Sequence, residues 1–117
     1  MTELPPIGLW AQAFALTLLI EVPIYAGLAP EGCGRARAAL AGAAGSALTH
    51  PLLWYVWVPL IPGYGRAVMS GEVLVVVLEI LVFHLLTGRR SLRRAAAAAL
   101  LANAASYGLG LVWQALR

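Results

Sequence analysis

The chain has 117 residues, 62% of them hydrophobic and 11% charged, with a mean hydropathy of +0.84. Because about a quarter of the residues in soluble domains are charged, this composition indicates an integral membrane protein and excludes an ordinary soluble domain. The net charge of +3 comes from arginines beside apolar segments, and no basic surface with interleaved aromatic residues predicts nucleic-acid binding. The single cysteine, Cys33, excludes an intramolecular disulfide and a cysteine-based metal cluster.

Apolar runs of membrane-spanning length predict helices over about 7–28, 38–58, 66–87 and 94–116. The first run follows an N-terminus without the positive region of a signal peptide, so we expect it to be retained. Turn-forming residues separate the runs at 29–34, at 59–65 (PLIPGYG) and from Gly88 into RRSLRR. We therefore predict an all-α polytopic fold, with residues 1–117 forming one transmembrane domain of four helices in a bundle.

The arginines predict the orientation of these helices. Six of the eight lie in or beside the first and third loops, namely Arg35, Arg37, Arg89, Arg90, Arg93 and Arg94. Only Arg66 and Arg117 lie on the other side, so the positive-inside rule puts the first and third loops in the cytoplasm. We expect a multi-pass protein of the bacterial inner (plasma) membrane with both termini outside.

The two halves of the chain share an ordered pattern of polar residues. LLIEVPIYAGL (18–28) aligns with VVLEILVFHLL (76–86), and RAALAGAAGSALTHPL (37–52) aligns with RAAAAALLANAASYGL (94–109). The alignment pairs Glu21 with Glu79, Ser46 with Asn103, and Thr49 with Ser106. Each repeat unit, at about 7–58 and 66–116, contains two spans, so we expect two repeated helical hairpins with the same orientation.

Helix geometry brings the polar residues of the two units to similar depths. Glu21 and Glu79 lie roughly 10–12 Å from the cytoplasmic ends of their helices, at 1.5 Å per residue. Ser46 and Asn103 lie roughly 12–14 Å from the same side. Four polar residues therefore share one predicted layer, and three more, Thr49, His50 and Ser106, follow one turn further out.

A carboxylate inside a membrane is costly unless it faces partners or water, so the two glutamates indicate a functional site. Pro23 and Pro51 lie nearby and leave backbone carbonyls without donors. No HExxH or CxxC motif identifies a metal, the cofactor is unknown, and no residue is assigned a catalytic role. We predict that a proton, a cation or a small ligand is bound or passed by Glu21, Glu79, Ser46, Thr49, His50, Asn103 and Ser106.

Two other functions remain open. Ser, Thr and Asn at small-xxx-small spacing also pack helices together, which would suit a structural or assembly subunit of a membrane complex. An intramembrane hydrolase would use His50 and a glutamate to activate water, although the sequence favours a non-enzymatic role. The expected partners are the lipid bilayer and either a second copy of the chain or another membrane protein.

The segments EVPIY (21–25), SALTHP (46–51) and NAAS (103–106) carry a resemblance. The chain resembles small bacterial four-span integral membrane proteins of uncharacterised function that have Glu-x-Pro, Thr-His-Pro and Asn-x-x-Ser motifs. This resemblance implies the fold but no activity, and Ser46 stands where that pattern has Asn. The chain is also similar to small multidrug resistance exporters in its four predicted spans and first-span glutamate, but Glu79 and the arginine bias depart from them.

Overall fold

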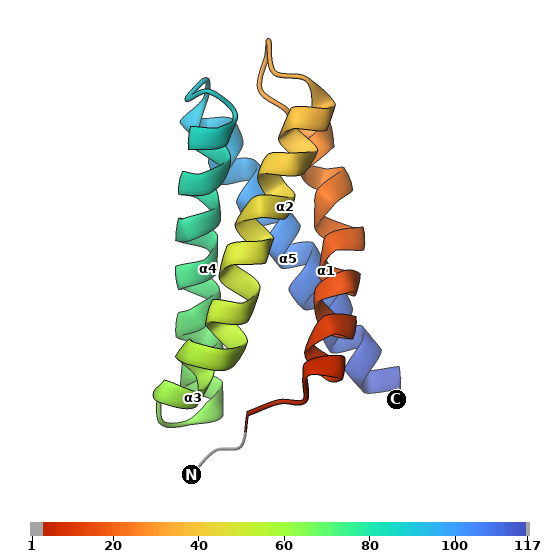
Figure 1. Cartoon of the computed structure of the whole chain (residues 1–117), viewed down its shortest axis with the longest axis vertical. Helices are drawn as coiled ribbons and strands as arrows, with labels where there is room; N and C mark the ends of the chain where they lie inside the picture. Colours follow the sequence, from red (N-terminus) through yellow and green to blue (C-terminus); the bar gives the residue numbers. More distant parts are fainter. Residues whose placement is uncertain (1–3, 117) are drawn as a thin grey trace.

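The structure is a computed structural model that describes residues 4–116, and every regular element in this range is helical (Figure 1). The predicted all-α class is therefore confirmed for these residues. In chain order the elements are α1 (Ile7–Gly27), α2 (Arg35–Leu52), the π-helical turn η1 (Leu53–Trp57), α3 (Val58–Leu60), α4 (Tyr64–Leu86) and α5 (Leu92–Leu116).

The helices begin at residues suited to that position. Pro6 precedes α1, where its fixed φ favours a helix start and its missing N–H breaks no hydrogen bond. Gly63 precedes α4 with a φ of 86°, a conformation that favours glycine. Ser91 precedes α5, and its Oγ accepts a hydrogen bond of 3.1 Å from the backbone N–H of Arg94. The predicted ranges 7–28, 66–87 and 94–116 consequently lie close to α1, α4 and α5.

The second helix differs most from its prediction of 38–58. It begins at Arg35, because arginine is a good helix former although it is too polar to count as part of an apolar run. Pro51 lies inside α2 and cannot donate a backbone hydrogen bond to the carbonyl of Ala47. The backbone then widens into η1 and continues through α3, so helical structure extends without a break from residue 35 to residue 60.

Three helices, α1, α4 and α5, are long and apolar enough to cross a membrane. They support membrane insertion of the chain. The sequence of α2, RARAALAGAAGSALTHPL, has the length of a short span but is less apolar, because alanine and glycine replace larger hydrophobic residues and two arginines lie in its first turn.

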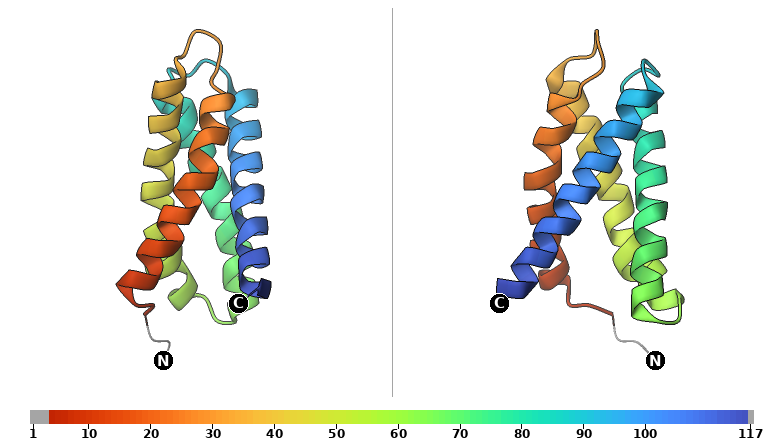
Figure 2. Two further views of the ribbon diagram at one scale, coloured as in Figure 1. Left: turned by 90° about the vertical axis from the view of Figure 1, so that its right-hand side faces the viewer. Right: turned by 180° about the vertical axis from the view of Figure 1, so that it is seen from behind.

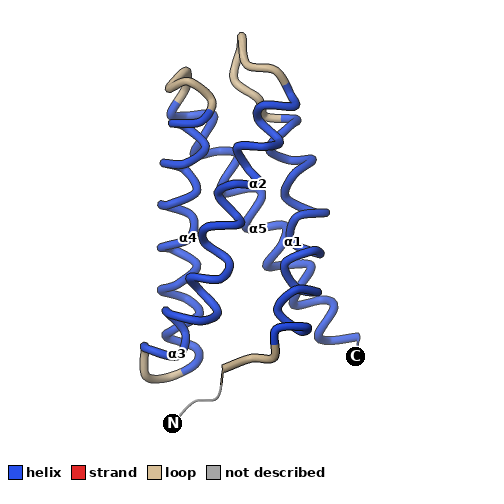
Figure 3. The backbone as a smooth tube through the Cα atoms, in the orientation of Figure 1, coloured by secondary structure: helices blue, strands red, loops and turns tan. Residues whose placement is uncertain are grey.

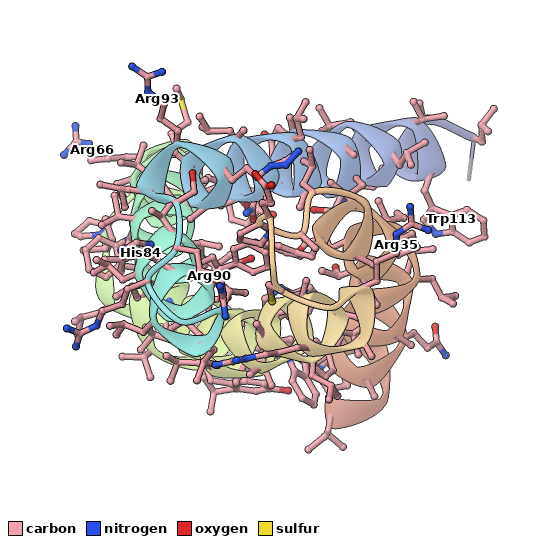
Figure 4. All side chains as sticks on the ribbon, turned by 90° about the horizontal axis from the view of Figure 1, so that it is seen from above. Arg35, Arg66, His84, Arg90, Arg93 and Trp113 are labelled. Carbon is pink, nitrogen blue, oxygen red and sulfur yellow. The ribbon has the colours of Figure 1, made fainter. Side chains whose placement is uncertain are left out.

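The long helices converge at one end of the bundle and diverge at the other. The loops at 28–34 and 87–91 lie together at the upper end, whereas the beginning of α1 and the end of α5 lie at the lower end (Figures 1 and 3). At the lower end the beginning of α1 lies apart from the end of α5 in the left view of Figure 2, and both lie apart from the beginning of α4 in the right view. Viewed from the loop end, Arg66 and Arg93 project away from the bundle (Figure 4).

Aromatic rings and small residues close the converging end. The side chains of Tyr25 and Phe83 are 0% and 1% exposed, and their ring centroids lie 4.9 Å apart. Gly42 of α2 packs so closely on the Tyr25 ring that a Cβ atom would overlap it. Small residues therefore let the helices approach each other here. The buried alanines of this core are Ala38, Ala41, Ala95, Ala98, Ala99 and Ala102.

Candidate functional site

Glu21 and Glu79 lie at corresponding places in α1 and α4, about two turns before each helix ends at the loop side. Each side chain is 2% exposed. Pro23 lies two residues after Glu21 in the same helix and cannot donate a backbone hydrogen bond to the carbonyl of Leu19. The sequence prediction that both glutamates face the bundle interior is consistent with this burial.

The Glu21 carboxyl group accepts two serine hydroxyl hydrogen bonds. Ser46 Oγ of α2 donates to Oε1 at 2.9 Å, and Ser106 Oγ of α5 donates to Oε2 at 2.6 Å. Each carboxyl oxygen therefore has its own donor. The sequence predicted Ser106 one helical turn outside the glutamate layer. In the structure it contacts the carboxyl group directly, because the long Glu21 side chain spans this difference in depth.

The Glu79 carboxyl group accepts three hydrogen bonds. Tyr25 Oη of α1 donates to Oε1 at 2.6 Å, and Thr49 Oγ1 of α2 donates to Oε2 at 2.9 Å. Asn103 Nδ2 of α5 makes a longer bond of 3.4 Å to Oε1 and a shorter one of 2.8 Å to the carbonyl oxygen of Ala99. Glu79 therefore has one donor more than Glu21, and the additional donor is the tyrosine.

The two carboxyl groups form one network that joins α1, α2, α4 and α5. Each accepts one hydrogen bond from α2 and one from α5. Within residues 4–116, neither has a basic side chain as a partner. Two ionised carboxylates in a low dielectric would repel each other, and protonation of one or both groups, or a bound cation, would relieve this repulsion.

A cavity of about 620 Å³ extends from this network between the diverging helices. Its inner part includes Glu21, Glu79 and Asn103. Its outer part is lined by residues near the beginning of α1 and the end of α5, so it extends toward the end of the bundle opposite the two loops. These outer residues include Leu9, Gln12, Leu111, Trp113 and Gln114. The polar layer is therefore the closed end of a long pocket.

His50 lines the cavity but makes no hydrogen bond to either glutamate. Its Nε2 lies 3.4 Å from Thr17 Oγ1, its ring stacks on Trp54 with centroids 5.8 Å apart, and its Nδ1 is buried without a partner among the described residues. In the described part of the chain, no group of three or more His, Cys, Asp or Glu side chains could hold a metal ion. Of the predicted site residues, His50 is the one that the structure does not bring to the carboxyl groups.

Sequence reasoning missed two residues of the site, Tyr25 and Glu72. Nothing in the sequence sets the rotation of α1 that points the Tyr25 hydroxyl group at Glu79. Glu72 also lines the cavity. Its position in the sequence could have indicated this, because a residue seven before Glu79 lies on the same face of a helix, about two turns away.

In comparisons with known proteins, no family model matches this chain. No curated protein and no solved structure matches it either. A function is therefore argued from the residues of the site and from the cavity that reaches them.

Proposed function

We propose that this chain is a small integral membrane protein whose intramembrane polar site binds or passes a proton, a cation or a small ligand. The observation that carries the proposal is the pair of buried carboxyl groups at the closed end of a cavity, held by five donors and without a basic partner in residues 4–116. Glu21 and Glu79 exchange the proton or bind the cation, and the hydroxyl and amide groups of Ser46, Thr49, Asn103 and Ser106 orient them.

The helical run from α2 to α3 is the fourth span of the proposed bundle. Its 26 residues would extend about 39 Å, more than the hydrocarbon thickness of a bilayer. Beyond the two arginines of its first turn, this run has exposed large apolar side chains, which suit contact with lipid. They are Leu40, Leu48, Val56 and Leu60.

The hydrogen bonds support two repeated hairpins. Under the sequence alignment of the halves, Ser46 corresponds to Asn103 and Thr49 to Ser106. Glu21 accepts from Ser46 of its own half and from Ser106 of the other, and Glu79 accepts from Asn103 of its own half and from Thr49 of the other. The exchange is what a two-fold axis along the membrane normal would produce.

The proposed membrane is the bacterial inner membrane, with the arginine-rich loops in the cytoplasm. The cavity extends toward the opposite end of the bundle, so it would open to the outer side. A ligand would enter from outside, and the aromatic core of Tyr25 and Phe83 would separate it from the cytoplasm in this conformation.

A structural subunit is the second candidate, because one network ties all four long helices together. In that case the carboxyl groups would serve as hydrogen-bond acceptors that lock the bundle for a partner protein or a second copy of the chain. The hydrolase alternative has less support, since His50 bonds to Thr17 and makes no hydrogen bond to either glutamate.

Native mass spectrometry of protein released from lipid nanodiscs tests the proposal. We expect the wild type and a Glu31→Gln control, changed at an exposed loop position, to carry a bound cation or small molecule that the Glu21→Gln/Glu79→Gln variant lacks. Proteoliposomes test proton passage in parallel, with flux retained in the control and lost in the double variant. Equal spectra and equal flux for all three proteins would reject a ligand or proton site, and a dissociated or unfolded double variant would favour the structural subunit.

A further inference from the structure

A second cavity lies on the side of the bundle and shares lining residues with the central cavity. A groove of about 390 Å³ is lined only by residues of α4 and α5. Three of these residues, Glu72, Asn103 and Tyr107, also line the central cavity. The polar site is therefore adjacent to an opening between two apolar helices, in addition to the opening at the lower end.

The rest of the groove is apolar and exposed. Met69 is 73% exposed and Leu100 is 56% exposed, and the remaining lining residues are Val76 and Ala104. In a bilayer the outer surface of α4 and α5 contacts lipid chains, so an apolar chain would be well solvated along this groove. The two cavities together suit a molecule with one polar end and one apolar end.

The charges that line the central cavity indicate which kind of polar head group it would accept. Three carboxyl groups line it, from Glu21, Glu72 and Glu79, and no arginine does so among the described residues. An anionic head group would be repelled, whereas an ammonium group would balance the charge. Trp54, Tyr107 and Trp113 also line this cavity, and aromatic faces attract cations.

We propose that the site takes a cationic amphiphile, with its amine or quaternary ammonium head in the central cavity and its apolar tail in the groove between α4 and α5. This inference rests on the proposed function, because the carboxyl pair must first be a cation site. It adds the class of ligand and a second route of entry, sideways from the bilayer through the groove, besides the route from the outer end of the bundle.

Binding of two probes to the protein in zwitterionic nanodiscs tests the tail and the head separately. Dodecyltrimethylammonium carries both parts, and tetramethylammonium carries only the head. Ala104→Trp fills the groove with a large ring, and Ala97→Trp is the matched control, since Ala97 is exposed two turns away on the same face of α5 and lines neither cavity.

We expect Ala104→Trp to weaken dodecyltrimethylammonium binding about tenfold, equivalent to about 1.4 kcal/mol, and to leave tetramethylammonium binding unchanged. Ala97→Trp should bind both probes like the wild type. If Ala104→Trp does not fold, Ala104→Leu narrows the groove less and should give a smaller loss of the same kind.

Two failures are distinguishable. If groove-filling variants bind dodecyltrimethylammonium like the wild type while Glu21→Gln/Glu79→Gln loses both probes, the cation site stands and the amphiphile proposal is wrong. If the double glutamate variant folds and binds both probes like the wild type, the proposed function itself is wrong and this inference falls with it.

Discussion

The two ends of the bundle differ in what lies between the helices. At the loop end, Tyr25 and Phe83 fill the centre and alanines bring the backbones together. At the other end, larger side chains such as Leu53, Trp54 and Trp113 surround a cavity. The glutamate network lies at the boundary between them. This difference indicates that tight packing and the cavity are separated along the bundle axis, with the glutamate network at the deepest point that the cavity reaches.

Removing an aromatic ring from each end should give the largest contrast. Phe83→Ala deletes a buried ring and its contact with Tyr25, and we expect a loss of about 3–5 kcal/mol in the free energy of unfolding. Trp113→Ala removes a ring that is 59% exposed and should cost less than about 1 kcal/mol. Unfolding in mixed micelles followed by circular dichroism measures both. Equal losses would contradict the division into a packed end and an open end.

The same substitution at two glycines should give effects of opposite sign. In Gly42→Ala the new Cβ atom meets the Tyr25 ring, and overpacking of this kind costs about 1–3 kcal/mol. In Gly108→Ala the Cβ atom meets nothing within 4 Å, so the better helix propensity of alanine should stabilise α5 by up to about 1 kcal/mol. Thermal unfolding of both variants in the same detergent provides the comparison, and a stabilised Gly42→Ala would show that α1 and α2 are not in close contact.

Much of the packed end was predictable, because its signals are local in the sequence. Small residues four apart, such as Gly42 with Ser46 and Ala99 with Asn103, correctly predicted faces that are buried in the bundle. Counting residues from the helix ends brought Glu21 and Ser46 to similar depths, and they are hydrogen-bonded. Depth along a helix follows from sequence position alone, at about 1.5 Å per residue.

The open end was not predictable in the same way. A cavity depends on how far the helices diverge, which is set by many contacts and by the π-helical turn after Pro51, not by one motif. Rotation about each helix axis was equally undetermined, so Tyr25 was missed and His50 was included among the predicted site residues. The structure turns the His50 ring toward Thr17 and Trp54 instead.

Removing the hydroxyl group of Tyr25, which donates to Glu79 and not to Glu21, should change the stability less but tests a single hydrogen bond. Tyr25→Phe keeps the ring and removes only the hydroxyl group that donates to Glu79 at 2.6 Å. A lost hydrogen bond to a carboxyl group should lower the free energy of unfolding by about 1–2 kcal/mol. Tyr107→Phe is the control, because no hydrogen bond involves that hydroxyl within residues 4–116 and its side chain is 43% exposed. Equal unfolding curves for the two variants would rule out the Tyr25 bond as a stabilising contact.

The smallest expected change in the free energy of unfolding comes from removing the hydroxyl group of a threonine. Thr49 contacts the glutamate network, whereas Thr17 lies in the wall of the cavity. Thr49→Val removes the 2.9 Å hydrogen bond to Glu79 and should cost about 0.6 kcal/mol, the average for such bonds between membrane helices. Thr17→Val removes only a 3.4 Å contact with His50 in the cavity wall and should cost less. Valine has nearly the same shape as threonine, so the loss in the free energy of unfolding, measured in the same micelles, reports the contribution of the hydroxyl group. A larger loss for Thr17→Val would mean that the cavity wall, rather than the glutamate network, holds the helices together at this depth.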